Sequence, residues 1–234
     1  MSIQKKDLIN KMIAIEKNKT LDFSKRLIEK YKLFSVILSD EGWYIDYGLA
    51  QKTLSEIYIS QIINNTAVLD TYMMDFYKKK LNRIIKYFEI KFKNRFLILK
   101  KAFKAHKNGD YELSIPVFLS QIEGIFYDLT QKNLFSNNKR YKEETAKKWV
   151  ESKIGSIDDL RLALLEPLRE NKNISSNFEE STNFPKVLNR NMILHGRDLK
   201  YSNEINSFKA ISLLLFIGTI AYDSENDSED ISWI

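Results

Sequence analysis

The sequence YELSIPVFLSQIEGIFYDLTQKN, residues 111–133, decides the predicted fold. Apolar residues recur along it at helical spacing: Leu113, Val117, Ile122 and Phe126. Pro116 fits a helix only near its start, so the helix begins close to Tyr111. Just before it, Asn108-Gly109-Asp110 is a tight-turn sequence that ends the preceding helical pattern. A helix this apolar must be buried, and we therefore expect residues 111–133 to form a core element.

The composition favours long helices. Among 234 residues, 44% are hydrophobic and 12% aromatic, but only 7 are Gly and 3 are Pro. A sandwich or barrel needs many sharp turns, which so few turn residues cannot supply. The chain is long enough for one large domain with an extension. We predict an all-α protein.

Helical periodicity also organises the rest of the chain. Residues 1–88 are predicted to form an N-terminal helical extension, with an elbow near Asn64-Asn65 or Asn82 and Asp22 as a helix cap. Residues 89–222 are predicted to form the helical core, interrupted by an irregular insertion at about 134–184 that has short helical patches at 144–153 and 157–169. Within this core one helix is expected to begin at Pro185 and end at Gly196, and another to run over 203–222. The acidic tail, 223–234, is predicted to be disordered because five of its first eight residues are acids.

Absent residue types exclude several functions. The chain has no cysteine, which excludes disulfides, thiolate nucleophiles and Cys-ligated zinc. Its two histidines are far apart and no acidic cluster has a metal-site spacing, so we expect no metal and no cofactor. The start shows no signal peptide, and the longest apolar run, 210–222, is shorter than the roughly 20 residues that cross a bilayer. These features predict a cytoplasmic protein without a membrane partner.

Positive charge is concentrated in one region. The net charge is +6, and lysines and arginines alternate with aromatic and aliphatic residues between positions 78 and 107. One interpretation is a solvated helix face; the other is a surface that binds nucleic acid. On the second interpretation, the candidate RNA-binding residues are Lys93, Lys100, Lys101, Lys104 and, further along the chain, Arg197.

The stretch Arg190-Asn191-Met192-Ile193-Leu194-His195 carries the strongest chemical signal. Arginine is always cationic and can hold a phosphate through two hydrogen bonds, whereas histidine can accept and donate a proton near neutral pH. On a helix, Asn191 and His195 lie on one face because they are four residues apart. Arg190 would bind a phosphate, Asn191 would orient the imidazole or a phosphate oxygen, and His195 would act as general acid or base.

An arginine, a polar residue and then a histidine after four intervening positions resemble the signature of HEPN-domain ribonucleases. Residues 190–216 are similar to bacterial members of the abortive-infection type, and Ser120-Gln121-Ile122-Glu123-Gly124-Ile125 resembles their preceding core helix. The resemblance covers roughly residues 90–222. It implies a HEPN-like helical bundle that forms a homodimer, brings two Arg/His sets into one cleft and cleaves RNA without a metal. It also implies a toxin or antiphage-defence role, with an antitoxin or another defence-system protein as partner.

The same residues have structural interpretations. His195 could simply cap the end of its helix, and Arg190 could form a structural ion pair with Glu123. An unpaired acid at position 123 would be costly in so apolar a helix, so we expect it within hydrogen-bonding range of Arg190 or His195. Tyr201 either reaches the same cleft or is a core tyrosine with a satisfied hydroxyl, and His106 is expected to be a solvated helix-end residue. The alternative function is therefore a non-catalytic HEPN-like module that binds RNA or a protein partner.

Overall fold

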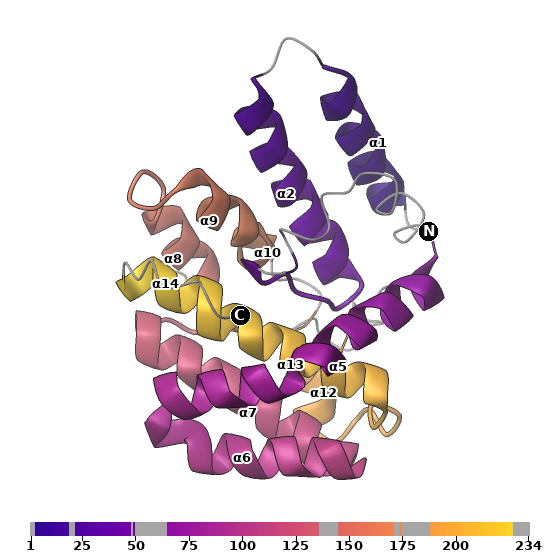
Figure 1. Cartoon of the computed structure of the whole chain (residues 1–234), viewed down its shortest axis with the longest axis vertical. Coiled ribbons are helices and arrows are strands. Elements are labelled where there is room, and N and C mark those ends of the chain that lie inside the picture. Colours follow the sequence, from indigo (N-terminus) through magenta and orange to yellow (C-terminus); the bar gives the residue numbers. More distant parts are fainter. Residues whose placement is uncertain are drawn as a thin grey trace.

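The computed structural model describes residues 3–18, 22–47, 49, 65–135, 145–170, 174 and 188–226, and these form helices joined by turns and loops (Figure 1). No strand occurs among the described residues, and the predicted all-α class is confirmed. The helices are α1 (Ile3–Lys17), α2 (Phe23–Asp40), α5 (Thr66–Lys91), α6 (Lys93–Asn108), α7 (Tyr111–Thr130), α8 (Ala146–Ser152), α9 (Asp159–Leu164), α10 (Glu166–Glu170), α12 (Arg190–Leu194), α13 (Glu204–Phe216), the π-helical turn η2 (Ile217–Ala221) and α14 (Tyr222–Asn226).

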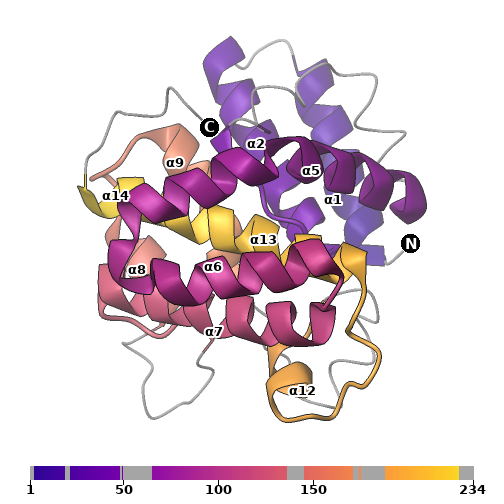
Figure 2. The ribbon, with the colours of Figure 1, turned by 60° about the horizontal axis from the view of Figure 1, so that its bottom comes forward.

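Helices α6 and α7 form a hairpin and run side by side in Figure 2, with α6 also packing on α5 and α7 on α13. Gly109 turns the chain in the left-handed conformation, with φ of 82°, and its N–H donates to the His106 carbonyl. Only glycine adopts this φ without steric cost, so the predicted turn at 108–110 is confirmed. As expected, α7 is a core element: Ile115, Phe118, Leu119, Ile122, Ile125 and Phe126 are fully buried.

The last helical stretch packs against α7 and α5. Asn203 caps α13, which continues through the η2 turn into α14. Glu204–Glu225 is long and apolar enough to cross a bilayer, but 83% of its apolar window is buried inside the protein. Such burial is typical of the core helix of a soluble protein, as predicted for the apolar run at 210–222.

Helices α1 and α2 pair with each other, and α2 also packs on α9 and α10. Asp22 caps α2 by accepting a hydrogen bond from the Ser24 N–H, as predicted. The Ser35 hydroxyl donates to the Ala163 carbonyl at 3.2 Å, across 128 positions of sequence. After α2, the chain enters the core, where Trp43 and Ile45 are fully buried.

The helical break between residues 65 and 108 lies at Phe92. Asn65 caps α5, which then runs without interruption through Asn82 to Lys91, so the elbow predicted near Asn82 is wrong. At Phe92 the backbone leaves helical geometry, with φ of −120° and ψ of 50°. Its ring packs on Phe88 and on Tyr222 of α14, and this tertiary packing holds the chain in the bend.

The helical patches predicted in the insertion are present as α8, α9 and α10, and they bury Trp149, Val150, Leu164, Leu165 and Leu168 in the common hydrophobic core. The predicted boundary at residue 88 falls inside α5, which packs against both α6 and α13. The division into an extension and a core stays a prediction.

The first residues of the acidic tail are helical. Asp223 and Ser224 are buried, and the Trp149 indole donates to the Glu225 carboxylate, which also pairs with Lys153 at 3.0 Å. The predicted disorder is wrong for residues 223–226, because residues of α8 and the following turn supply partners for this turn of helix. The rest of the tail and Pro185 itself lie outside the described residues. The helix predicted to begin at Pro185 instead begins at Arg190, because Asn189 is extended and caps it, so the predicted start is wrong.

Candidate functional site

Helix α12 is short and places the motif arginine at its first position. The Asn189 side chain caps it by accepting a hydrogen bond from the Met192 N–H at 3.1 Å. The Arg190 N–H donates to the Ile174 carbonyl at 2.8 Å. Capping and this long-range bond satisfy two N–H groups that a helix start would otherwise leave unpaired.

The Arg190 guanidinium lies against α7. One Nη donates to Glu123 Oε2 at 2.6 Å, the other donates to Asn191 Oδ1 at 3.1 Å, and its carbon lies 5.6 Å from the centre of the Phe135 ring. The expectation that Glu123 lies within hydrogen-bonding range of Arg190 or His195 is confirmed for Arg190. Both side chains are about a quarter exposed, at 25% and 28%, so the ion pair is accessible from solvent.

The imidazole of His195 is not part of this arrangement. His195 is the C-cap of α12: its backbone N–H donates to the Asn191 carbonyl, and Gly196 follows in the left-handed conformation, as predicted for the helix end. The side chain is exposed and makes no hydrogen bond or ion pair with any residue that the structure describes. Within one chain, then, the structure brings together Arg190, Asn191 and Glu123 but does not join them to His195.

Exposed leucines surround His195. Leu194 is 37% exposed and Leu199 is 86% exposed, and the intervening Gly196 and Arg197 are exposed as well. Two accessible leucines so close together are more apolar surface than a turn needs, which suits a face that contacts another protein.

Tyr201 ties the loop after α12 to the start of α7. Pro116 has no N–H, so the Glu112 carbonyl, four residues earlier, lacks its normal helical donor. The Tyr201 hydroxyl donates to that carbonyl at 3.1 Å. Of the two interpretations, the satisfied hydroxyl is correct, although the side chain is only half-buried.

The candidate RNA-binding residues Lys93, Lys100, Lys101, Lys104 and Arg197 are all exposed. Arg95, in the same basic region, is held differently. It forms an ion pair with Asp128 at 2.7 Å and donates to Gln121 at 3.1 Å, and it lies so close to Gly124 that a Cβ there would be 2.4 Å from its Nη1. Glycine at position 124 lets this guanidinium lie flat on α7.

His106 is buried, and its prediction as a solvated helix-end residue is wrong. Its Nδ1 lies 2.8 Å from the Ser207 hydroxyl, which is 3.2 Å from the Ser114 hydroxyl, so three helices meet at this polar cluster. The Phe208 ring meets the imidazole edge-on, with ring centres 4.6 Å apart. Burial lowers the pKa of His106 to about 4; Glu204 has a smaller raising effect, and Lys78 a smaller lowering effect. The imidazole is therefore neutral at pH 7 and has a structural role.

A second buried polar group was missed in the sequence. Lys209, in the apolar α13, is 3% exposed, and its Nζ lies 3.6 Å from Asp70 Oδ1. The Trp43 indole donates to the same oxygen at 2.8 Å, and the ammonium lies 5.7 Å from the centre of the Trp43 ring. The sequence signal that could have revealed this group was a lysine inside an apolar helix, because a buried charge requires a counter-charge.

No cluster of three or more His, Asp or Glu side chains in the described ranges is arranged to hold a metal ion. Comparison of the chain with protein-family models, with curated proteins and with solved structures finds no significant match. The functional argument therefore rests on the residues themselves.

Proposed function

We propose that this protein is a metal-independent endoribonuclease of the HEPN-like type, acting in a bacterial toxin or antiphage-defence system. The observation that carries the proposal is the Arg190 guanidinium, oriented by Glu123 and Asn191, with the exposed, unengaged His195 imidazole at the end of the same five-residue helix. The observed bonds use two of the five guanidinium N–H donors. The Nη groups therefore retain N–H donors that can form hydrogen bonds to a phosphate.

The reaction would be an intramolecular transesterification. A base removes the proton of a ribose 2′-hydroxyl, its oxygen attacks the adjacent phosphorus, and the bond to the 5′-oxygen breaks. The products are a 2′,3′-cyclic phosphate and a 5′-hydroxyl, so no metal or redox partner enters the balance. His195 moves a proton to or from these oxygens, and Arg190 stabilises the charge that develops on the phosphate.

A homodimer would complete the site, since within one chain the Arg190 guanidinium bonds to Glu123 and Asn191 and not to the His195 imidazole. The exposed Leu194 and Leu199 beside His195 are apolar enough to pack against a second copy across a two-fold axis. Sedimentation at micromolar concentration tests this requirement: a fully active monomer would contradict it.

The second candidate is a non-catalytic helical module that binds RNA or a protein. The Arg190–Glu123 ion pair favours it, because Glu123 cancels the charge that a phosphate would need. The two functions differ in whether phosphodiester bonds are broken. A cytoplasmic location and an antitoxin or other defence-system partner belong to the first proposal.

Cleavage of single-stranded RNA in excess EDTA separates the two candidates. The nuclease predicts cyclic-phosphate products from the wild-type chain and none from His195→Ala or Arg190→Ala. His106→Gln is the matched control, since it replaces the other histidine and should leave cleavage unchanged at pH 7. Activity that EDTA abolishes, or that His195→Ala retains, would remove the proposal.

A further inference from the structure

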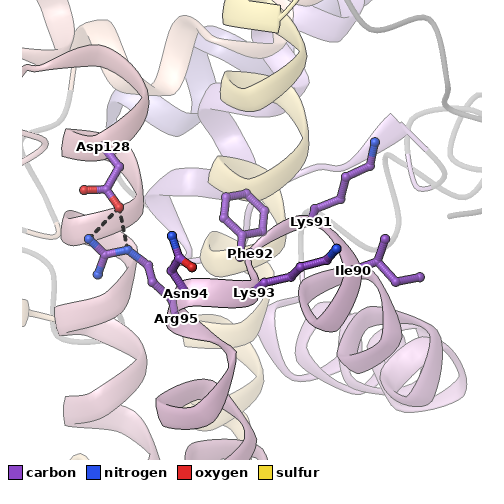
Figure 3. Close-up of a pocket in the computed structure, with 7 residues that line it drawn as sticks. All are labelled: Ile90, Lys91, Phe92, Lys93, Asn94, Arg95 and Asp128. Carbon is purple, nitrogen blue, oxygen red and sulfur yellow. Dashed lines mark hydrogen bonds and ion pairs between the residues drawn. The ribbon is translucent and has the colours of Figure 1, made fainter.

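A pocket of about 440 Å³ lies at the bend between α5 and α6, and three of its seven lining residues are cationic (Figure 3). Its lining residues are Ile90, Lys91, Phe92, Lys93, Asn94, Arg95 and Asp128. The volume is within the range of small-molecule sites, but a charged lining does not suit the apolar ligands that most such sites bind.

Two of the three cations of the pocket, Lys91 and Lys93, are not neutralised by any residue that the structure describes. Asp128 is the single acid in the lining, and Arg95 already pairs with it. The next acid along α5, Glu89, pairs with Lys86 at 2.7 Å. Among the described residues no carboxylate forms an ion pair with Lys91 or Lys93. Two ammonium groups therefore share one concave surface without a counter-charge.

Lys91 is positioned by its neighbours, whereas Lys93 is exposed at the start of α6. The bend at Phe92 brings the end of α5 and the start of α6 together, and Figure 3 shows Lys91 and Lys93 extending on one side of Phe92 while Arg95 reaches Asp128 on the other. The ammonium of Lys91 lies 5.6 Å from the centre of the Tyr222 ring, a favourable cation–π arrangement. No side chain caps α6, so the partial positive charge of its start adds to that of the lysines.

We infer that this pocket binds a phosphate group. The assignment rests on the proposed function in one respect: the expected source of the phosphate is the backbone of the RNA, with a free nucleotide as the other source. Asp128 of the pocket and Glu123 of the Arg190 site lie on one helix, five residues and about 7.5 Å of helical rise apart. Five residues also turn the helix by about 500°, so the two sites lie about 140° apart around the axis of α7, and an RNA strand that contacts both must pass around this helix.

The test measures binding, so that it does not depend on cleavage. The probes are a short single-stranded RNA with 2′-O-methyl groups, which lacks the attacking hydroxyl, together with inorganic phosphate and adenosine 5′-monophosphate. The variant is Lys91→Ala/Lys93→Ala, and Lys11→Ala/Lys25→Ala on α1 and α2 is the control with the same change in net charge. Each contact with a single strand contributes about 0.7 to the slope of log affinity against log salt. The pocket variant should thus lose about 1.4 of slope and roughly 25-fold in RNA affinity at 0.1 M salt.

The probes distinguish the sources of the phosphate. Loss of RNA affinity in the pocket variant alone assigns the site to the RNA backbone. Unchanged RNA affinity with loss of inorganic phosphate or nucleotide binding keeps the phosphate site and assigns it to a free ligand. Wild-type affinities for all three probes in the pocket variant would overturn the inference. A wild-type chain that binds no RNA would instead count against the proposed function, and the inorganic phosphate titration would still test the pocket.

Discussion

Replacing His106 by glutamine should change how the stability of the protein depends on pH. The imidazole lies among three helices, with its Nδ1 beside the Ser207 hydroxyl and its ring against Phe208. A glutamine amide can still bond to Ser207, but it does not titrate. The substitution therefore removes the protonation of this site while keeping a polar partner for the serine.

The size of the effect follows from the pKa. Burial lowers the pKa of His106 to about 4, from the 6.5 of an exposed histidine. Between pH 6.5 and pH 4 the unfolded chain binds the proton and the native chain does not, so the free energy of unfolding falls as the pH falls. A difference of about 2.5 pKa units corresponds to roughly 3 kcal/mol, which is fully present above pH 6.5 and is lost on approaching pH 4.

Urea unfolding of both proteins at several pH values between 7 and 4 measures this contribution. Carboxylates titrate in both proteins, so their effect cancels when the two free energies of unfolding are subtracted. The free energy of unfolding of the wild type relative to that of His106→Gln should therefore fall by about 3 kcal/mol from pH 7 to pH 4. Since the chain has only two histidines, an imidazole NMR titration of the His195→Gln variant follows His106 alone. A difference in free energy of unfolding that is the same at every pH, or a His106 NMR signal that titrates near pH 6.5, would refute the reasoning.

Three further predictions concern contacts of α7 and of the η2 turn. Glu123→Gln should lower the RNA cleavage rate roughly 10- to 100-fold, the effect of one charged hydrogen bond, and lower RNA affinity less; equal losses in single-turnover and binding assays would contradict a positioning role. Gly218→Ala should destabilise the fold by about 1–3 kcal/mol in urea unfolding, because its Cβ would lie 2.7 Å from Phe88 Cζ; an unchanged midpoint would show that the ring has room to move. Tyr201→Phe should lower the free energy of unfolding by about 1 kcal/mol in the wild type and by less in Pro116→Ala, whose restored N–H can donate to the Glu112 carbonyl in place of the tyrosine. Equal losses in the two backgrounds would argue against this substitution of one donor for the other.

Features set by neighbouring residues could be predicted from the sequence. The apolar spacing of residues 111–133 predicted α7, and Gly109 predicted the turn before it, because both depend on local geometry. Glu123 could be assigned a partner in advance because a carboxylate in an apolar helix needs one, and the Arg190 motif offered the donor.

Features that depend on residues far apart in the sequence could not be predicted. The partner of His106, Ser207, is 101 positions away, so the sequence near His106 showed only a polar residue next to a turn. The bend at Phe92 has no Gly or Pro near it in the sequence, and it depends on a ring of α14. Under the proposed function, whether His195 meets an Arg190 depends on a second chain, which no spacing within one chain describes.

The packing of α2 on α9 also has a consequence for synthesis. Ala163, whose carbonyl lies 3.2 Å from the Ser35 hydroxyl, is synthesised 128 residues after Ser35. At ribosomal rates of about 5–20 residues per second, the delay is about 6 to 25 seconds. During that interval the apolar side of α2, including the buried Phe34, Ile37 and Leu38, has no α9 to cover it. The nascent chain therefore offers chaperones a hydrophobic helix near its N-terminus, and fragments that stop short of residue 159 should be the most prone to aggregate.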